Sequence, residues 1–455
     1  MKKNVALVLT AAMMAGMVSP AAAEESSQDK PYEGVTLHYA VSDSAATGNG
    51  ETQDLVNMVK EKTGINIEFT IIPNSADGEV DKKLVSLQAG DELDLIYGTT
   101  AALKTYYEAG VLTPIDELAA NDGYDMEAVF GDSLPKYDDG LTYGLPAFND
   151  VWCTFINTTV FENAGVEIPS AEGWTWEKYI ETAKQLTNEE EEIYGSFMLD
   201  YDCYNYMYAL QKGAEHYKED GTANYDDPLF KEGLEFFYGL GNEEMIQPDI
   251  TTYKAGVYPW NAFTSTGVAN EDGSYDNAQF GMFVCGGWAA SMLADQEKYP
   301  RDWECVILPM PYPEGYDPST LVVTGCYAIP TTSQNKEAAF EALKCIAENQ
   351  YTLGYGRVPA NINLTDEEID EYLENVIVPT YAESDGITAD QLKAAWFDSN
   401  RKNLSEKIVG VADTTLSQIW VSEGQLYGQG QQDIDTTINN IQERANEAIE
   451  EALAN

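Results

Sequence analysis

Histidine and basic side chains are scarce in this chain. Among its 455 residues only His38 and His216 are histidines, and 25 Lys and Arg residues stand against 77 Asp and Glu residues. The formal net charge is therefore −52 at pH 7. A surface this negative repels phosphate backbones and anionic lipid headgroups, so we expect no nucleic-acid partner and no attachment to an anionic membrane surface.

The sequence also lacks the motifs of common catalytic and cofactor sites. No Gly-Lys dipeptide, Gly-x-Gly-x-x-Gly or His-Glu-x-x-His sequence occurs, which argues against a P-loop, a dinucleotide fingerprint and a common zinc motif. With two histidines and no Gly-x-Ser-x-Gly motif, a histidine-activated nucleophile is disfavoured. We expect no cofactor, no metal site and no catalytic residue. A pair of glycosidase carboxylates about 5–9.5 Å apart stays open, because sequence does not show such separations.

Cysteines are few and widely spaced. No Cys-x-x-Cys motif occurs, and most of the six lie in apolar segments, as Met282–Cys285 illustrates. An exported chain can form disulfides, but buried free thiols fit this pattern at least as well. Cys285 and Cys305 are the first pair to test for a disulfide. The six are Cys153, Cys203, Cys285, Cys305, Cys326 and Cys345.

The only extended apolar segment lies near the start of the chain. Lys2 and Lys3 precede the apolar stretch Val5–Val18, and Ala21-Ala22-Ala23 supplies a small-residue cleavage pattern. The stretch is shorter than the roughly 20 residues that a membrane-spanning helix needs. We therefore expect a signal peptide at residues 1–23 and an extracytoplasmic protein, in a periplasm, at a cell surface or secreted. No cysteine for a lipid anchor lies near the cleavage site.

Strands and helices alternate along the first part of the chain. Alternating or continuous apolar residues predict strands, and apolar residues with helical spacing predict the segments between them. This alternation indicates an α/β lobe with a mainly parallel sheet. The predicted elements are strand Val35–Val41, helix Glu51–Lys62, strand Ile65–Ile72, helix Lys82–Ala89 and strand Leu93–Tyr97.

The same alternation resumes after residue 150 and gives way to helices. No obvious linker separates the two parts, which suggests that the chain crosses between two lobes more than once. The predicted strands are Trp152–Asn157, Gln279–Cys285, Glu304–Leu308 and Leu321–Ile329, and the predicted helices are Thr175–Leu186, Tyr206–Gly213, Pro228–Leu240 and Asp433–Ala454.

Aromatic residues with polar edges point to ligand binding. The chain has 29 Tyr and eight Trp against 14 Phe. Tyr and Trp combine an apolar ring face with a polar group, which suits the faces and hydroxyl edges of a sugar. The informative cases lie at predicted strand ends, where open α/β sheets place ligands. They are Thr99-Thr100, Asn149-Asp150-Val151-Trp152, Tyr201-Asp202 with Tyr204 and Tyr206, and Gly286-Gly287-Trp288.

Several short segments, taken in order and spacing, resemble a known family. They include Lys60-Glu61-Lys62-Thr63-Gly64-Ile65-Asn66-Ile67, Tyr107-Glu108-Ala109-Gly110-Val111-Leu112-Thr113-Pro114-Ile115, Tyr143-Gly144-Leu145-Pro146, Trp174-Thr175-Trp176-Glu177 and Gly325-Cys326-Tyr327-Ala328-Ile329-Pro330. Gly286-Gly287-Trp288 stands where the family usually has a Gly-Pro-Trp-like motif. Over about residues 35–455 the chain resembles the family 1 extracellular solute-binding proteins, relatives of maltose-binding protein.

The resemblance implies an α/β fold of the two-lobed, type II-like periplasmic-binding-protein kind. Its discontinuous lobes would be joined by crossover strands around a ligand cleft. Lobe 1 would comprise residues 24–147 and 325–378, and lobe 2 residues 148–324 and 379–455. The function implied is that of a monomeric binding component of an ABC importer, which would take up a small-molecule ligand, foremost an oligosaccharide, and deliver it to the membrane permease subunits.

The family's ligand positions carry over only where loops correspond. Trp288 is the strongest candidate for a stacking platform, although it could instead cap the core of its lobe. Gly325 would let the backbone approach the ligand, and Arg357 would either point into the cleft or pair with nearby acids. The resemblance implies ligand-binding roles for Asp43, Thr99, Thr100, Asn149, Asp150, Tyr201, Asp202, Trp288, Gly325, Tyr327 and Arg357.

The implied mechanism is hinge closure driven by ligand contacts to both lobes. Three alternatives stay open. The same scaffold could bind a polyamine or a peptide, since acidic cleft residues suit cations. A secreted glycoside hydrolase is the alternative from a different class, and a sensing or adhesive surface protein without a permease is the third.

Overall fold

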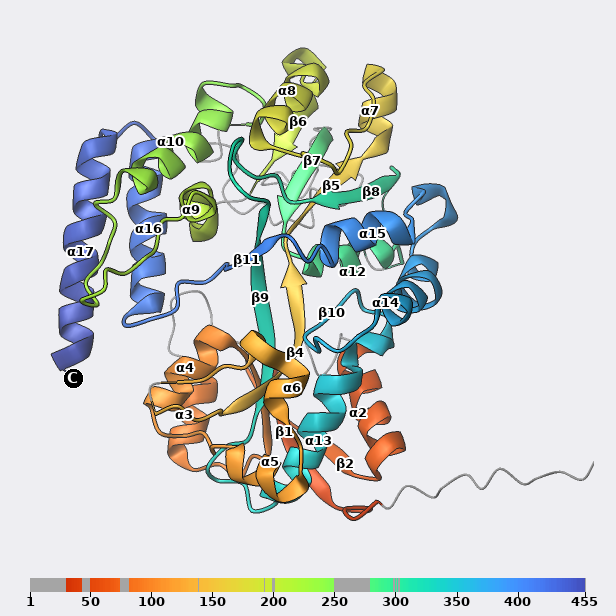
Figure 1. Ribbon diagram of the computed structural model, residues 1–455. Coiled ribbons are helices and arrows are strands. Elements are labelled where there is room, and N and C mark those ends of the chain that lie inside the picture. The colour runs from red at the N-terminus through yellow and green to blue at the C-terminus, as the bar shows by residue number, and fades with distance from the viewer. Residues whose placement is uncertain are drawn as a thin grey trace, which may run out of the picture.

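Two α/β halves, each built around its own β-sheet, make up the described protein (Figure 1). The computed structural model describes residues 30–42, 50–73, 82–137, 139–191, 193–198, 201–248, 279–297, 299, 301 and 303–454. The predicted signal peptide at residues 1–23 and the candidate ligand residue Asp43 lie outside these residues.

The first half is built on a seven-stranded sheet with the order β10-β4-β9-β3-β1-β2, in which β11 also pairs with β9. Alternation along β1 buries Leu37, Tyr39 and Val41 in one core with Leu95 of β3. The strands are β1 (Thr36–Ser42), β2 (Asn66–Ile72), β3 (Leu95–Thr99), β4 (Gly144–Val151), β9 (Ser319–Ala328), β10 (Val358–Pro359) and β11 (Lys402–Ser405).

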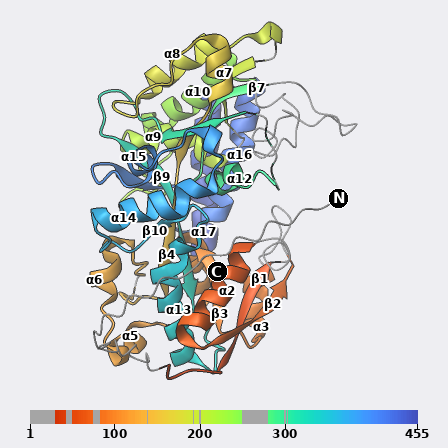
Figure 2. The same ribbon diagram turned by 90° about the vertical axis from the view of Figure 1, so that its right-hand side faces the viewer.

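Helices cover this sheet, as Figures 1 and 2 show. The two that matter most for the site are α2 (Gly50–Thr63) and α13 (Lys336–Asn349), whose Leu55 and Leu343 lie in the same core as the strands. The N-cap residue Thr99 starts α4, because its side chain accepts a hydrogen bond from the amide of Ala102. The remaining helices are α3 (Lys82–Ala89), α4 (Thr100–Glu108), α5 (Asp116–Asp122) and α6 (Met126–Phe130).

The second half is built on a four-stranded sheet with the order β6-β7-β5-β8. Its core is rich in aromatic residues, among them Trp176, Tyr179 and Phe283. The strands are β5 (Cys153–Asn157), β6 (Ile193–Phe197), β7 (Gln279–Cys285) and β8 (Cys305–Pro309). The helices are α7 (Thr158–Ala164), α8 (Trp176–Leu186), α9 (Asp202–Gln211), α10 (Pro228–Asn242), α12 (Trp288–Ala294), α14 (Asp366–Tyr372), α15 (Ala389–Trp396), α16 (Asp413–Gly428) and α17 (Ile434–Ala454).

The predicted alternation of strands and helices is confirmed, but the predicted strand direction is partly wrong. The pairs β1·β2 and β1·β3 are parallel as expected. In contrast, β9 runs antiparallel to both β3 and β4, and β10 runs antiparallel to β4. The reason is that β9 enters this sheet from the second half rather than through a helical crossover within the first. Helix α9 begins at Asp202, four residues before the predicted start at Tyr206.

The chain passes between the halves where β4 leads into β5 and β8 leads to β9. Only Trp152 separates Val151, the last residue of β4, from Cys153, the first of β5. Trp152 is buried, and its amide donates to the carbonyl of Leu321 on β9. The lobe boundaries implied by the resemblance would cut inside β4 and β9, and they remain a proposal.

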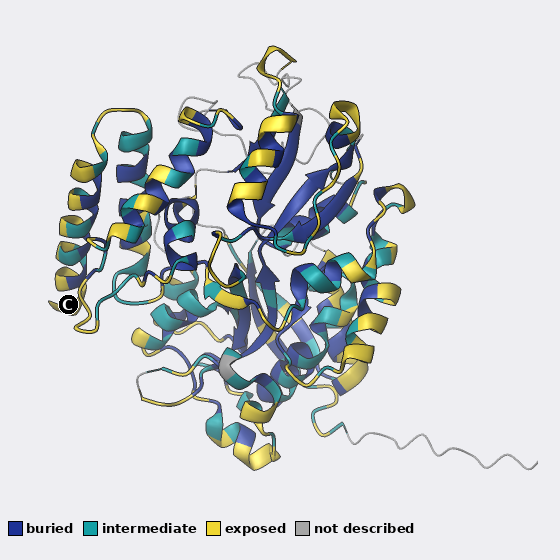
Figure 3. Cartoon of the chain, turned by 45° about the horizontal axis from the view of Figure 1, so that its top comes forward, coloured by how far each residue is buried: buried dark blue, intermediate teal, exposed yellow. Residues whose placement is uncertain are grey.

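The strands lie inside and the exposed residues lie on outward helix faces (Figure 3). All six cysteines are buried and free, so the disulfide considered between Cys285 and Cys305 is absent. The reason is geometric, because β7 and β8 lie on opposite sides of β5. Within the described ranges, no helix has both the length and the apolar character needed to cross a bilayer.

Candidate functional site

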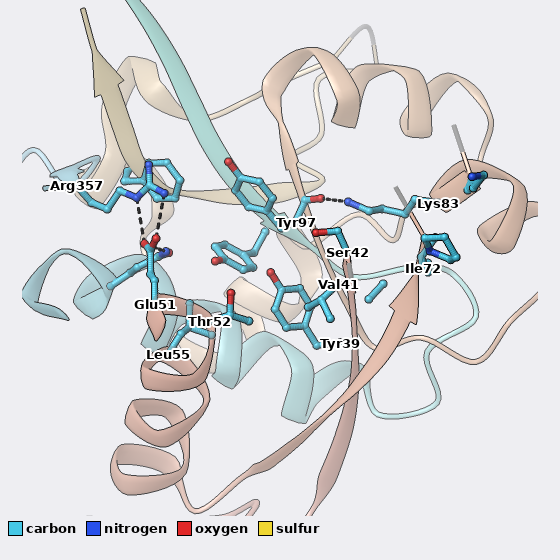
Figure 4. Close-up of a pocket in the computed structure, with 16 residues that line it drawn as sticks. Tyr39, Val41, Ser42, Glu51, Thr52, Leu55, Ile72, Lys83, Tyr97 and Arg357 are labelled. Atoms are coloured by element: carbon cyan, nitrogen blue, oxygen red, sulfur yellow. Dashed lines mark hydrogen bonds and ion pairs between the residues drawn. The ribbon is translucent and has the colours of Figure 1, made fainter. Parts of the chain in front are cut away.

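A pocket of about 300 Å³ opens where β1, β2 and β3 end beside the start of α2 (Figure 4). Val41 and Ser42 close β1, and Ile72 and Pro73 follow from β2. The carboxyl ends of neighbouring parallel strands are where open α/β sheets bind ligands. The remaining lining includes Tyr39, Glu51, Thr52, Leu55, Lys82, Lys83, Tyr97, Phe148, Tyr327, Gln350 and Arg357.

Four aromatic rings form one wall of this pocket. Tyr97 packs against Tyr327 with ring centroids 5.4 Å apart, and it stacks on Phe148 at 6.0 Å with an interplanar angle of 17°. Tyr39 also packs against Tyr327, with ring centroids 5.9 Å apart. Burial raises the pKa of Tyr39 and of Tyr97 above the ordinary tyrosine value, so both phenols stay protonated. The wall therefore offers ring faces and neutral hydroxyl groups.

Gly325 is required by the packing of this wall. A Cβ atom at position 325 would lie 2.4 Å from the nearest atom of the Phe148 ring, well inside van der Waals contact. Gly325 pairs with Thr99 on β3 and with Phe148 on β4. The space that a side chain at position 325 would need is thus filled by Phe148.

Arg357 connects the start of α2 to the crossover strand β4. Its Nε and Nη2 donate to the two carboxylate oxygens of Glu51, each at 3.0 Å, and its Nη1 donates to Asp150 at 2.7 Å. The guanidinium carbon lies 4.3 Å from the centre of the Phe148 ring. Gln350 donates to Glu51 at 2.8 Å. Figure 4 shows the pair of Arg357 and Glu51 at the edge of the pocket.

The charges of this cluster depend on each other. Burial alone would lower the pKa of Arg357, but Asp150 and Glu51 outweigh it and leave that pKa well above its ordinary value. Burial raises the pKa of Asp150, against the opposing effect of Arg357. Arg357 therefore stays charged, and its position is fixed by two carboxylates and a ring. Such a bidentate pair holds its geometry better than a lysine would.

A second group of aromatic residues lies in the other half. Tyr201, with 38% of its surface exposed, stacks on Tyr204, which in turn stacks on Phe237. Trp288 begins α12 and is partly buried against the core of the second half. A Cβ atom on Gly286 would lie 2.6 Å from the indole nitrogen of Trp288, so the glycine lets this ring fold back over the backbone. Trp288 thus has a core contact and a partly exposed ring.

Polar contacts link this second group to the crossover. The indole nitrogen of Trp152 donates to Glu406 at 3.0 Å, and Lys407 pairs with Glu406 at 2.6 Å. Tyr206 donates to Asp202 at 2.8 Å and to the carbonyl of Glu406 at 3.2 Å. Asp202 is buried at the start of α9. Its contacts in the structure are therefore internal ones.

The structure divides the predicted site residues among several places. Tyr327 and Arg357 line the pocket, and Asp150 bonds to Arg357. Thr100 and Asn149 line a different cavity of about 490 Å³ between α4, β9 and β11, and Thr99 caps α4. Tyr201, Asp202 and Trp288 lie in the second half. Gly325 lies under Phe148.

Sequence reasoning missed several residues of the pocket wall. Tyr97 closes a predicted strand and could have been found by the same strand-end rule that selected Thr99 and Thr100. Tyr39 and Phe148 lie within strands, where alternation predicts burial but not what the ring faces. Glu51 and Gln350 carry no local signal, since each acquires its role from Arg357, a residue distant in sequence.

The site contains no arrangement that points to a bound metal. Among the described residues, no group of three or more His, Cys, Asp or Glu side chains could hold a metal ion. The glutamate of the pocket is bonded to Arg357 and Gln350. What the arrangement offers is a set of ring faces beside hydrogen-bonding groups, which is the chemistry of binding.

The fold and the pocket define a class, the two-lobed periplasmic solute-binding proteins. The chain belongs to the family of bacterial extracellular solute-binding proteins, whose sequence pattern matches residues 45–352. The resemblance drawn from the sequence is thereby confirmed. Members of this family are binding proteins rather than enzymes.

Similar structures cover nearly the whole chain. An ABC substrate-binding protein of Listeria monocytogenes in complex with cycloalternan has a TM-score of 0.72 at 20% identity, covering 91% of this chain and 99% of that one. Maltose-bound MalE3 of T. maritima has a TM-score of 0.66 at 16% identity, covering 90% and 99%. A protein of Brucella abortus (strain 2308), named as a binding protein, is 24% identical over 325 residues, which are 69% of this chain and 73% of its own length.

Proposed function

We propose that this protein is the extracytoplasmic component of an ABC importer that binds a sugar or oligosaccharide. The observation that carries the proposal is the pocket at the ends of β1, β2 and β3. It combines the ring faces of Tyr97 and Tyr327 with the fixed hydrogen-bonding cluster around Arg357. Pyranose rings match such a surface, because their C–H faces stack on aromatic rings and their hydroxyls exchange hydrogen bonds.

The similar structures support the same ligand class. Two of them were solved with cycloalternan and with maltose. We propose that the signal peptide at residues 1–23 directs export, that the protein acts as a monomer, and that the loaded form docks on membrane permease subunits. The ATPase would be a separate chain.

We further propose that binding closes the two halves over the ligand. In this mechanism Tyr97 and Tyr327 hold one face of the sugar, and Trp288 and Tyr201 of the second half cover the other. A ligand that contacts both halves stabilises the closed form by the difference in its affinity for the closed and open forms. The connections at Trp152 and at β9 would be the hinge.

Isothermal titration calorimetry tests the proposal. The protein is titrated with neutral mono- and oligosaccharides, with spermidine and putrescine, and with short peptides. Binding of a sugar supports the proposal, and binding of amines or peptides alone refutes the sugar assignment. Tyr97→Ala is expected to weaken sugar binding by about 5- to 150-fold, because it removes a ring worth about 1–3 kcal/mol of buried apolar contact. Tyr316→Ala, at an exposed tyrosine elsewhere, is the control.

The enzymatic alternative needs its own measurement. Sugars that bind are incubated with the protein, and the products are separated by chromatography. We expect the sugar to be recovered unchanged. Formation of shorter sugars at a rate that follows protein concentration would refute a binding function and favour a glycoside hydrolase.

A further inference from the structure

The pocket at the ends of β1, β2 and β3 has more basic than acidic lining residues, the reverse of the chain as a whole. In the sequence acidic residues outnumber basic ones by 77 to 25, about three to one. Among the described residues that line the pocket, Lys82, Lys83 and Arg357 are basic and only Glu51 is acidic. The net charge of −52 repels anions from the protein as a whole. The lining of this pocket therefore departs from the rest of the molecule in a direction that favours an anion.

The two lysines lie at one end of the pocket and Arg357 lies at the other. Figure 4 shows Lys83 on the far side of Tyr97 from the pair of Arg357 and Glu51. Nζ of Lys83 donates to the carbonyl of Tyr97 at 2.6 Å, which places its ammonium group beside the aromatic wall. An ammonium group that donates to a carbonyl oxygen keeps its positive charge. Lys82 adds a second, exposed lysine to the same end.

The charge of Arg357 is matched within the protein. Both carboxylate oxygens of Glu51 accept from Arg357, and Asp150 accepts from its Nη1. With both carboxylates ionised, the three groups together carry one net negative charge. This end of the pocket therefore does not attract an anion, and an acidic group on a ligand is drawn toward the lysine end.

The position of the two lysines is unfavourable for their own helix. Lys82 and Lys83 are the first two residues of α3, and no described residue of its first turn is acidic. The amino end of a helix carries partial positive charge, so acidic side chains stabilise it and basic ones do not. Residues that violate a local stability rule are expected where they serve a function. The pocket that these lysines line gives them one.

We propose that the pocket selects sugars that carry an acidic group, which Lys82 and Lys83 bind while the sugar ring lies against Tyr97. This inference rests on the proposed function and adds the charge of the ligand. A carboxylate and a phosphate share the required chemistry, since the oxygens of both accept charge-assisted hydrogen bonds from ammonium groups. An amino sugar or a polyamine would place a like charge at this end. Lys82 and Lys83 thus act as specificity-determining residues.

Matched sugars test the proposal on the unaltered protein. Calorimetry compares glucuronate, glucose 6-phosphate, glucose and glucosamine, then the same four forms of galactose, each also as the terminal unit of a disaccharide. We expect one acidic form to bind at least about 10-fold more tightly than its neutral and amino counterparts, the effect of a hydrogen bond between charged groups. The carboxylate and phosphate arms show which acidic group the pocket takes.

Ionic strength gives a second measurement that needs no variant. The lysines lie at the surface end of the pocket, where salt screens the attraction between charges. Raising the salt concentration from about 20 mM to about 500 mM should weaken binding of the acidic sugar and leave binding of its neutral counterpart unchanged.

A pair of double variants assigns the effect to the two lysines. Lys82→Gln with Lys83→Gln removes both positive charges. We expect it to bind the acidic sugar about 10- to 100-fold more weakly, to bind the neutral sugar within about 3-fold of the unaltered protein, and to lose the salt dependence. Lys60→Gln with Lys62→Gln is the matched control. It removes the same charge from the last turn of α2, the helix whose first residues line the pocket, and is expected to bind as the unaltered protein does.

The outcomes separate this inference from the proposed function. Equal or tighter binding of the neutral or amino sugars overturns the acidic selectivity while leaving a sugar-binding protein. A preference for acidic sugars that persists in the variant lacking Lys82 and Lys83 overturns the assignment to these residues. Failure of every sugar to bind, whether acidic, neutral or amino, overturns the proposed function, and the selectivity falls with it.

Discussion

The close approach of Phe148 to Gly325 makes Gly325→Ala a sharp test of how the pocket wall is built. An added Cβ atom would lie 2.4, 2.7 and 2.8 Å from three atoms of the Phe148 ring. Carbon atoms in contact normally lie about 3.5–4.0 Å apart, so the ring must move by about 1 Å. Overpacking of this kind costs about 1–3 kcal/mol of stability.

Displacement of the Phe148 ring should also weaken ligand binding. Phe148 stacks on Tyr97 and lies against the guanidinium of Arg357. A shifted ring therefore disturbs both a stacking surface and the charged cluster. We expect Gly325→Ala to lower the free energy of unfolding by about 1–3 kcal/mol in urea denaturation and to weaken sugar binding by about 10-fold in calorimetry.

Two further variants control this measurement. Gly239→Ala is the matched control, because a Cβ atom there meets only the Glu243 carboxylate at 3.9 Å within helix α10. It should stabilise by up to about 1 kcal/mol. Combining Gly325→Ala with Phe148→Leu should recover part of the lost stability, since it removes the clash. If Gly325→Ala is as stable as the unaltered protein and binds equally well, contact with Gly325 does not fix the position of the Phe148 ring.

Two other predictions concern stability, and one concerns the cysteine thiols. Burial lowers the pKa of His216 from 6.5 to about 4, so the unfolded chain takes up the proton before the folded protein does as the pH falls. The free energy of unfolding should therefore decline by about 3 kcal/mol between about pH 6.5 and 4. Denaturation curves measured across this range should show a smaller decline for His216→Gln. Burial raises the pKa of all six cysteine thiols, that of Cys153 to about 12. A thiol reagent should therefore label none of them in the native protein and all six in urea without reductant. Fewer than six labelled thiols in urea would reveal a disulfide. Trp152→Phe removes the hydrogen bond to the buried Glu406 and should lower the free energy of unfolding by about 1–3 kcal/mol. Trp174→Phe, which removes a hydrogen bond to the hydroxyl of Thr154, should lower it by less. Equal losses for the two variants would argue against a special role for Glu406.

The sequence predicted the elements better than their arrangement. Periodicity placed most helices and strands to within a few residues, and strand Gln279–Cys285 has the predicted bounds. The direction of β9 was not predictable, because it depends on whether the chain enters the strand from the first half or from the second half. A pattern of apolar residues is the same for a parallel and an antiparallel strand.

The candidate site was predictable only where a residue carries its own signal. Tyr327 lies in a segment that resembles the family, and Arg357 was expected either to point into the cleft or to pair with nearby acids; both line the pocket, and Arg357 does pair with Glu51 and Asp150. Glu51 and Gln350 were not predicted, because a glutamate in a helix and a single glutamine have the sequence pattern of ordinary surface residues. Their role follows only from their contacts with Arg357 and with each other. Asp43 lies outside the described residues, and the ligand-binding roles of all the predicted residues remain predictions.

Small-angle X-ray scattering with and without a saturating sugar tests whether the two halves close over the ligand. In the proposed mechanism a sugar is clamped between two halves that move about the crossover at Trp152. The radius of gyration should therefore fall when a sugar identified by calorimetry is added, and it should fall less for Tyr97→Ala when the sugar is held near the dissociation constant of the unaltered protein. An unchanged radius of gyration, with the sugar demonstrably bound, would rule out closure of the two halves.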